Sequence, residues 1–356
     1  MEMKIAQIAP LNEAVPPRFY GGTERVVAYL CDALVEMGHD VTLFASAEAR
    51  TRAKLAPMRD QAIRLDACPL TCDVAAHLNM LDEVRKRQHE FDVLHFHIDL
   101  LQYPLFEEIA DQTLTTLHGR LDLKDLASVY ERWPRYPLVS ISNSQRAPVA
   151  DANWAGTVYH GLPMSQFEFS PAPKGRYLAF LGRISPEKGP ERAIAIARAA
   201  GITLKIAAKI DPADAAYFHR RVEPLLNDPL IEFIGEIGEQ EKSAFLGDAL
   251  ALLFPIDWPE PFGMVLIEAM ACGTPVIAWN RGSVPEIIEH GVTGYVVNSE
   301  AEALEAIGRL KNLNRLRIRH NCERRFSAVA MAKRYLDVYA RLLGRTAFEV
   351  DRQDAV

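Results

Sequence analysis

The sequence predicts an α/β protein of two domains, each built on a parallel β-sheet. A strand, a helix and a second strand follow one another over residues 4–45, which is the order of a parallel βαβ unit. Strands and helices alternate again from Tyr177 onward. Between the two halves, the stretch Leu162 to Arg176 holds three prolines and has no clear period, which indicates a linker between domains. The length of 356 residues also favours two domains.

The composition argues against several classes of protein. The chain is 49% hydrophobic and 24% charged, as a globular protein is, and its net charge is −7. It has no basic stripe of the kind that binds nucleic acid. No apolar run approaches the roughly 20 residues that span a bilayer, and the first residues lack a signal-peptide core. The five cysteines are scattered, which favours reduced thiols and a cytoplasmic location.

The first half is expected to form strands joined by helices. Thr23 to Met37 carries apolar residues at helical spacing, and Gly38 ends it. Gly21 and Gly22 precede this helix, after a loop with three prolines. The arrangement lacks the G-x-G-x-x-G sequence of dinucleotide-binding folds. Strands are expected at Lys4–Ala9, Val41–Ala45, Asp92–Ile98, Thr113–His118, Leu138–Ser142 and Thr157–His160.

Histidines lie on two of these strands. Because strand side chains alternate, His95 and His97 point to one face of the sheet, and with Asp99 they spell H-x-H-x-D. That pattern also occurs in metallohydrolases, although a metal site there needs further ligands. His118 ends its strand and is followed by glycine, at the edge where open α/β sheets bind ligands. Asn143 follows another strand at the same edge.

The second half carries a candidate phosphate clamp. Arg183 and Lys188 are five residues apart in a turn between a strand and a helix, and Pro190 opens the helix. Arginine offers a forked donor and lysine a point charge to a phosphate. Strands are expected at Tyr177–Leu181, Thr203–Ala208, Ile231–Ile234, Ala251–Pro255, Pro275–Ala278 and Tyr295–Val297.

The stretch Trp258 to Pro275 holds two glutamates separated by seven residues. Glu260 lies in a loop, and Glu268 lies in a predicted apolar helix from Phe262 to Cys272. Gly263 lets the backbone approach a ligand closely, and the free N–H groups of the helix start suit an anion. A glutamate in so apolar a helix is costly unless it has a partner or a ligand.

This stretch, W-P-E-P-F-G-M-V-L-I-E-A-M-A-C-G-T-P, resembles the double-glutamate signature of retaining glycosyltransferases of family 4, which have the GT-B fold. The resemblance continues in residues 282–297 and in the G-R-x-x-x-x-K-G loop. It implies two Rossmann-like domains whose parallel sheets face one another across a central cleft. Residues 1–165 would form the acceptor-side domain, with a C-terminal helix in 328–356 packing back on it, and residues 166–327 would bind the nucleotide sugar.

The resemblance also implies a role for each residue of the site. Glu260 would bind sugar hydroxyls and Glu268 ribose hydroxyls, while Arg183, Lys188 and the amides after Pro261 would bind the diphosphate. The catalytic residues would be Glu260, His118, Arg183 and Lys188. The donor-binding residues would be Gly22, Arg183, Lys188, Ile237, Glu260, Pro261, Phe262, Gly263, Met264, Val265 and Glu268. The acceptor side would comprise Gly21, Gly22, His97, His118 and Asn143.

The expected activity is transfer of a hexosyl group, with retention, from a nucleotide diphosphate sugar to a hydroxyl acceptor. No metal ion or cofactor is expected, because the clamp stabilises the leaving diphosphate and no plausible loop contains D-x-D. A front-face path fits a site without a paired carboxylate. UDP-glucose is the default donor, and the acceptor is expected to be a small soluble molecule or a saccharide. The alternatives are a metal-dependent hydrolase using His95, His97 and Asp99, and a non-catalytic sugar-nucleotide binding protein.

Overall fold

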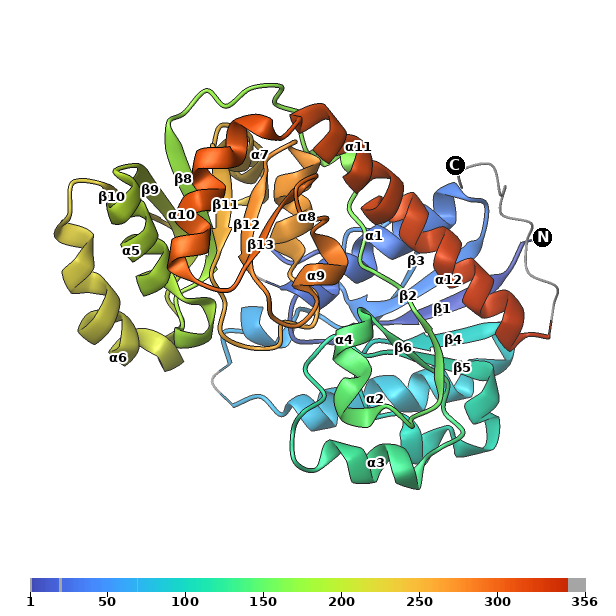
Figure 1. Cartoon of the computed structure of the whole chain (residues 1–356). Coiled ribbons are helices and arrows are strands. Elements are labelled where there is room, and N and C mark those ends of the chain that lie inside the picture. Colours follow the sequence, from blue (N-terminus) through green and yellow to red (C-terminus); the bar gives the residue numbers. More distant parts are fainter. Residues whose placement is uncertain (1, 19–20, 69, 345–356) are drawn as a thin grey trace. The chain divides into compact units, whose positions relative to one another are not determined.

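A computed structural model describes residues 2–18, 21–68 and 70–344. The chain divides into two compact units (Figure 1). The first contains the described residues up to Gly161 and those from Ala328 onward, and the second is Leu162–Ser327. Within the described part of the chain, no helix combines the length and the apolar character that crossing a bilayer requires.

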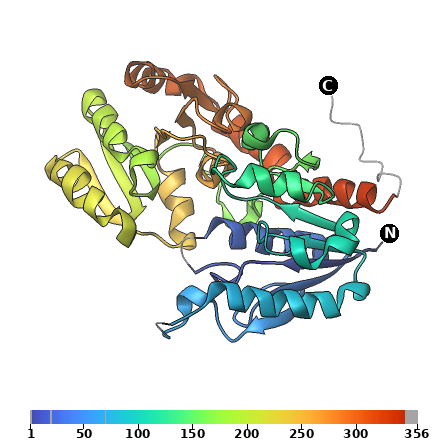
Figure 2. The ribbon, with the colours of Figure 1, turned by 90° about the horizontal axis from the view of Figure 1, so that it is seen from below.

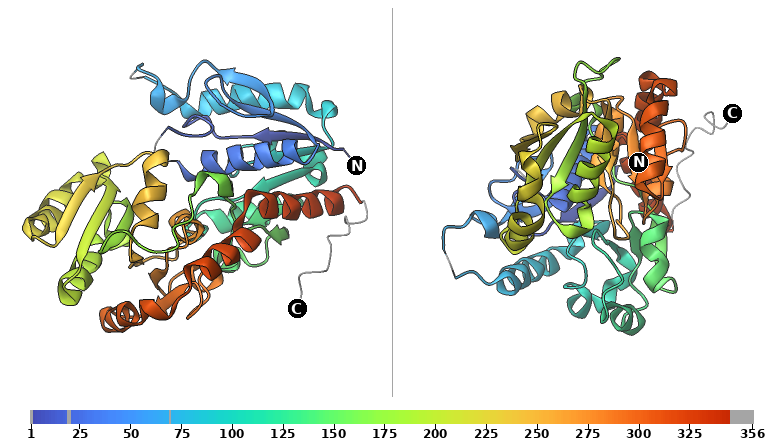
Figure 3. Two further views of the ribbon diagram at one scale, coloured as in Figure 1. Left: turned by 90° about the horizontal axis from the view of Figure 1, so that it is seen from above. Right: turned by 60° about the vertical axis from the view of Figure 1, so that its left-hand side comes forward.

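The first unit is built on a parallel sheet, as predicted. It has seven strands, one more than expected, in the order β3-β2-β1-β4-β5-β6-β7. Figures 2 and 3 show α2 along one face of this sheet and α1 on the opposite face. The strands are β1 (Lys4–Ile8), β2 (Asp40–Ser46), β3 (Lys54–Arg59), β4 (Val93–Phe96), β5 (Thr113–Thr116), β6 (Leu138–Ser140) and β7 (Trp154–Thr157). The helices are α1 (Gly22–Glu36), α2 (Asp73–Lys86), α3 (Leu126–Arg132), α4 (Asn143–Arg146) and α12 (Ala328–Leu342).

Two details of the first sheet differ from the prediction. β3 was not predicted, because its residues K-L-A-P-M-R contain a proline and are flanked by charged side chains. Proline is tolerated there because β3 is an edge strand. The last strand is β7, which ends at Thr157 where the predicted strand begins. The chain stays beside the sheet after it, since Val158 N–H donates to Ser140 O at 2.9 Å.

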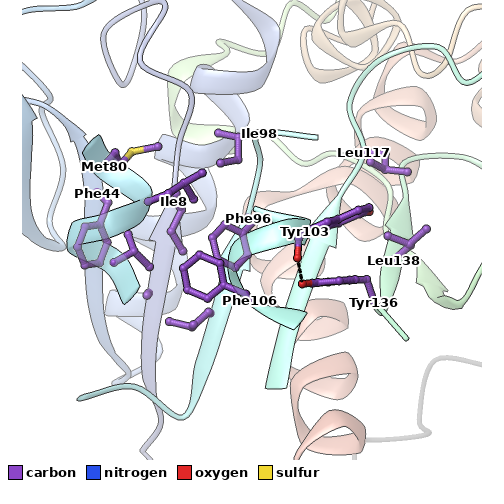
Figure 4. Packing of buried hydrophobic residues seen from close by; sticks show 14 of the residues in the cluster. Ile8, Phe44, Met80, Phe96, Ile98, Tyr103, Phe106, Leu117, Tyr136 and Leu138 are labelled. Carbon is purple, nitrogen blue, oxygen red and sulfur yellow. Dashed lines mark hydrogen bonds between the residues drawn. The ribbon is translucent and has the colours of Figure 1, made fainter. Parts of the chain in front are cut away.

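The two faces of the first sheet differ in chemistry. Phe44 and Phe96 point into an apolar cluster that is covered by Met80 of α2 (Figure 4). The alternate residues of neighbouring strands, Gln7 of β1 and His95 of β4, point to the other face, where they contact Tyr339 of α12. One face is therefore an ordinary apolar core, and the other buries polar side chains under α12.

The second unit is built on a six-stranded parallel sheet, again as predicted, in the order β10-β9-β8-β11-β12-β13. The strands are β8 (Tyr177–Arg183), β9 (Thr203–Lys209), β10 (Ile231–Gly235), β11 (Ala251–Phe254), β12 (Val276–Trp279) and β13 (Gly294–Val297). The helices are α5 (Pro190–Ala200), α6 (Ala215–Tyr217), α7 (Glu239–Gly247), α8 (Met264–Ala271), α9 (Val284–Ile287), α10 (Glu300–Arg309) and α11 (Arg315–Phe326).

The segments at the domain boundaries are packed onto these sheets. The predicted linker lies on the second unit, where Leu162 N–H donates to Phe326 O at 2.8 Å and Phe167 is buried. Beyond Ser327, α12 lies on the first unit beside α1. Residues 345–356 of the predicted C-terminal segment lie outside the described part of the chain.

Candidate active site

A loop between β8 and α5 positions Lys188 in the second unit. Gly189 follows Lys188 with a left-handed φ of 69°, and a Cβ atom there would lie 2.2 Å from Pro255 O. Only glycine fits so close to the chain that leaves β11. The loop is therefore held against the end of β11, where the carboxyl ends of parallel strands form the usual ligand-binding edge.

This placement brings Lys188 to Glu260. Lys188 Nζ donates to Glu260 Oε2 at 2.5 Å, and Trp258 Nε1 donates to the same oxygen at 2.9 Å. The ammonium group also lies 4.9 Å from the centre of a Trp258 ring. The Lys188 and Glu260 side chains are only 17% and 11% exposed. The structure thus joins a predicted phosphate ligand and a predicted sugar ligand in one nearly buried ion pair.

A second segment fixes the backbone at Glu260. Gly282 has φ of 54°, and a Cβ atom there would lie within 2.5 Å of Glu260 N. The next residue, Ser283, donates its N–H to Glu260 O at 3.0 Å and its hydroxyl to Phe262 O at 2.8 Å. The start of the G-S-V-P-E sequence therefore holds the glutamate loop in place.

The helix after this loop begins later than the sequence analysis predicted. α8 starts at Met264 instead of Phe262, because Gly263 adopts a left-handed φ of 82° that a right-handed helix cannot include. Pro261 and Phe262 are buried in the loop, while Met264 and Val265 form the partly exposed first turn. The helix start still presents its unpaired amides at this edge of the unit.

Glu268 is 3% exposed on α8, and the structure supplies the partner that its burial requires. Lys242 Nζ on α7 lies 2.9 Å from Glu268 Oε1 and 3.4 Å from Glu239 Oε2. Sequence reasoning missed Lys242 because it stands in a helix with several charged residues, where nothing distinguishes it from a solvated lysine. Ile237, the predicted base contact, is half-buried in the loop that leads into α7.

Arg183, the other member of the predicted clamp, has different neighbours. Its guanidinium donates to Glu187 Oε1 at 2.6 Å, and its Nε lies 3.4 Å from Asp214 Oδ2. The side chain is one-third exposed. The clamp residues are thus divided, since Lys188 pairs with Glu260 while Arg183 pairs with carboxylates beside the loop.

The predicted acceptor-side glycines lie at the start of α1 in the first unit. Gly21 has φ of 157°, and a Cβ atom there would lie 2.8 Å from Pro17 Cβ, so this position requires glycine. Gly22 opens the helix, and a Cβ atom there would meet nothing within 4 Å. The helix therefore begins with room beside its first amide. Asn143 is exposed at the start of α4, where its Oδ1 accepts from the Thr157 hydroxyl at 3.0 Å.

The predicted histidines of the first unit contact one another directly. His97 Nδ1 lies 2.8 Å from His118 Nε2, and His97 Nε2 lies 2.8 Å from Gln7 Oε1. The His118 ring stacks on that of His160, with centroids 5.2 Å apart. Burial lowers the pKa of His118 to about 3 and holds the pKa of His97 well below its usual value. Both imidazoles are therefore neutral near pH 7.

The hydrolase alternative does not fit this geometry. His95 Nδ1 lies 2.7 Å from the Tyr339 hydroxyl, and His95 Nε2 lies 2.7 Å from Thr116 Oγ1. A metal ligand needs a nitrogen lone pair that no other group occupies, and hydrogen bonds within the protein engage both His95 nitrogens. Among the residues that the structure describes, no three His, Cys, Asp or Glu side chains are grouped so as to hold a metal ion.

Two protein-family models match the chain, one in each half. The family described as "Glycosyltransferase Family 4" matches residues 20–151. The family described as "Glycosyl transferases group 1" matches residues 165–325. The two matches include the predicted acceptor-side residues from Gly21 to Asn143 and the loop and helix that carry Lys188, Glu260 and Glu268.

Several proteins of known identity are similar to this chain in sequence or in fold. A D-inositol 3-phosphate glycosyltransferase from Thermobispora bispora is 25% identical, with 91% of each chain covered. The crystal structure of a glycosyltransferase involved in avilamycin A biosynthesis aligns with a TM-score of 0.72 at 25% identity, covering 96% of this chain and 98% of that one. The Anabaena protein HepE in complex with UDP-glucose aligns with a TM-score of 0.72 at 18% identity, covering 96% of this chain and 100% of the other.

Proposed function

The chain belongs to the glycosyltransferases of the GT-B fold that are similar to family 4, and from this premise we propose its reaction. We propose that it moves a hexosyl group from a nucleotide diphosphate sugar to a hydroxyl of a small molecule or a saccharide. The anomeric configuration is retained, and no metal ion takes part. UDP-glucose is the default donor.

The ion pair of Lys188 and Glu260 is the observation that carries this proposal. Breaking the bond between a sugar and a diphosphate builds positive charge on the sugar and negative charge on the leaving group. Lys188, together with the amides that open α8, offers positive charge to the diphosphate. Both side-chain hydrogen bonds of Glu260 reach Oε2, so Oε1 can accept from a sugar hydroxyl. Positive charge therefore lies beside the leaving diphosphate, which becomes more negative, and the Glu260 carboxylate lies beside the sugar, which becomes positive.

The state of Glu260 favours a front-face path over a covalent intermediate. Its carboxylate is neutralised by Lys188 and also accepts the Trp258 indole N–H, and both interactions make an oxygen a poorer nucleophile. The departing phosphate then takes the proton of the incoming hydroxyl on the same face of the sugar, which retains its configuration. Lys188 and Arg183 supply the cationic charge that a metal ion provides in other sites.

Glu268 and Lys242 support a nucleotide contact further along α8. The Glu268 carboxylate is 3% exposed and pairs with Lys242 at 2.9 Å, and its remaining acceptor positions suit ribose hydroxyls. For the acceptor, the named substrate of the Thermobispora relative is a small polar molecule, which agrees with a small hydroxyl compound here. The net charge of −7 disfavours an anionic lipid surface as the acceptor.

A ligand screen identifies the donor. Thermal-shift measurements with a panel of nucleoside diphosphates and their sugars should give a raised melting temperature for one family of ligands, because a ligand that binds only the folded state stabilises it. NMR of the product made from that donor should then show the same anomeric configuration as the donor. An inverted product, or a rate that collapses with chelator and returns with magnesium or manganese, contradicts the proposed mechanism.

The role of Lys188 has a matched control. Lys188→Ala should lower turnover by about 100- to 1,000-fold at saturating donor, since comparable contacts to a developing anion have that effect. Lys205→Ala removes a lysine that pairs with Glu232 at 3.1 Å on neighbouring strands of the same unit. It should leave turnover within about twofold, as a partly exposed ion pair contributes little. Equal turnover by both variants removes Lys188 from the mechanism.

A further inference from the structure

Six buried side chains in the first unit form one continuous line of hydrogen bonds that ends at the half-buried His118. Each consecutive pair lies 2.7–3.0 Å apart. The line starts on α12, crosses β5 and β4, returns to α12, and reaches β1, β4 and the end of β5. In order, its members are Tyr335, Thr116, His95, Tyr339, Gln7, His97 and His118.

Gln7 gives this line its direction. Its Nε2 donates to the Tyr339 hydroxyl at 3.0 Å, and its Oε1 lies 2.8 Å from His97 Nε2. An amide oxygen only accepts, so His97 carries its proton on Nε2. Because His97 is neutral, its Nδ1 is an acceptor, and His118 must donate from its own Nε2. Every other member can donate or accept in either sense, whereas the two ends of an amide are different groups.

This direction of the hydrogen bonds fixes the role of His118 Nδ1. With the proton on Nε2, His118 Nδ1 carries a lone pair and acts only as an acceptor. Within the described part of the chain, this atom is buried and accepts no hydrogen bond. A buried acceptor without a donor is unfavourable, and His118 stands at the end of β5, on the ligand-binding edge of the sheet. A donor on a bound ligand would complete the line.

We propose that Gln7 and Tyr339 are positioning residues that hold His118 as the Nε2–H tautomer, so that its Nδ1 accepts a hydrogen bond from a hydroxyl of the sugar-bearing substrate. Neither residue touches the substrate. The identity of that hydroxyl donor rests on the proposed function, whereas the fixed tautomer does not. Tyr339 acts from α12, through Gln7 of β1.

NMR of the free protein tests the tautomer without any substrate. In protein labelled with ¹⁵N-histidine, the nitrogen shifts should show His97 and His118 protonated on Nε2. Tyr339→Phe removes the acceptor of the Gln7 amide, so the amide can turn and both histidines should become mixtures of tautomers. Gln7→Leu should do the same. Gln7→Glu keeps an acceptor facing His97 and should preserve the native tautomers.

Tyr136→Phe is the matched control, because the buried Tyr136 hydroxyl donates to Tyr103 O at 2.5 Å in the apolar cluster, away from the line. It should leave every histidine signal unchanged. An Nδ1–H tautomer of His118 in the parent protein overturns the proposal. Native tautomers of His97 and His118 in Tyr339→Phe also overturn the proposal. This variant lacks only one hydroxyl, so it can be measured even if Gln7→Leu does not fold.

Kinetics tests the link to the substrate. Tyr339→Phe should lower kcat/KM for the sugar donor by about 3- to 10-fold, the effect of one weakened hydrogen bond. It should leave the affinity for the free nucleoside diphosphate unchanged, and Tyr136→Phe should change neither quantity. Equal losses in both tyrosine variants mean a general structural effect and refute the positioning role. Native tautomers in a protein that turns over no sugar donor refute the proposed function and leave the tautomer assignment standing.

Discussion

The buried histidines of the first unit should make its stability fall steeply below pH 6.5. Burial is the main cause that lowers the pKa of four histidines, to about 3 for His118 and well below the usual value for His95, His97 and His160. In the unfolded chain each has a pKa near 6.5. Above that pH both states are unprotonated and the histidines contribute nothing. Below pH 6.5 the histidines bind protons in the unfolded state but not in the folded state, so acid favours unfolding.

The magnitude follows from proton linkage. At pH 5.5, one unit below the unfolded pKa, each such histidine lowers the free energy of unfolding by about 1.4 kcal/mol. Four of them together lower it by about 5–6 kcal/mol, which is comparable with the whole stability of a typical domain. Carboxylates of the unfolded chain are still ionised at this pH, and the raised pKa of buried Glu24 and Asp99 in the folded first unit offsets part of the loss. The loss should therefore be confined to the first unit.

Urea unfolding at pH 7.5, 6.5 and 5.5 measures this effect when peptide-resolved hydrogen exchange follows each unit separately. The midpoint for peptides of β4 and β5 should move to lower urea below pH 6.5, while peptides of β11 and β12 change little. His95→Gln should reduce the pH dependence by about a quarter, whatever it does to absolute stability. His219→Gln is the control, since His219 is exposed beside Glu223. Equal midpoints at pH 7.5 and 5.5 would refute the reasoning.

Two further predictions concern the second unit. Gly189→Ala should lower the melting temperature and turnover together, because the left-handed φ and the close Pro255 oxygen combine to cost about 1–3 kcal/mol or more. Gly201 has a φ of 63° with open space around it, so Gly201→Ala should lower the melting temperature less and leave turnover intact. Equal losses in the two variants would contradict this explanation. In calorimetric titrations, Glu268→Ala should weaken binding of the free nucleoside diphosphate, whereas Glu260→Ala should affect chiefly the sugar-bearing donor. Parental affinity for the free diphosphate in both variants would mean that Glu268 is not the ribose ligand.

Local sequence was enough to predict the two parallel sheets. Most strands were recognisable as short apolar runs between helical patterns, because the strands of parallel sheets are buried on both faces. β3 was not predicted because it contains a proline, which an edge strand tolerates. The start of α8 was predicted two residues too early, because apolar periodicity does not reveal a backbone dihedral angle. At the start of this helix, Gly263 was the residue whose type indicated a left-handed φ.

The contacts within the candidate site could not be predicted from the sequence. Lys188 and Glu260 each stood out in the sequence, yet 72 residues separate them, and only the packing of Gly189 on the end of β11 brings them together. No sequence pattern distinguished Lys242 from a solvated surface lysine. For the first unit, alternation correctly placed His95 and His97 on one face, but their partners come from β1 and α12. Such pairings depend on which elements become neighbours, which no local pattern encodes.

The position of α12 has a consequence for how the chain is made. Gln7 and Tyr339 bond across 332 residues of sequence, so a ribosome that has already synthesised every strand of the first sheet must still produce the whole second unit before Tyr339 emerges. Throughout that interval the nascent sheet lacks the helix that covers its polar face and part of α1. At typical translation rates of about 5–20 residues per second, the wait is roughly 10–40 seconds. During it, an incomplete sheet is the species that chaperones would meet, while the second unit, whose residues are contiguous, can fold as soon as it leaves the exit tunnel.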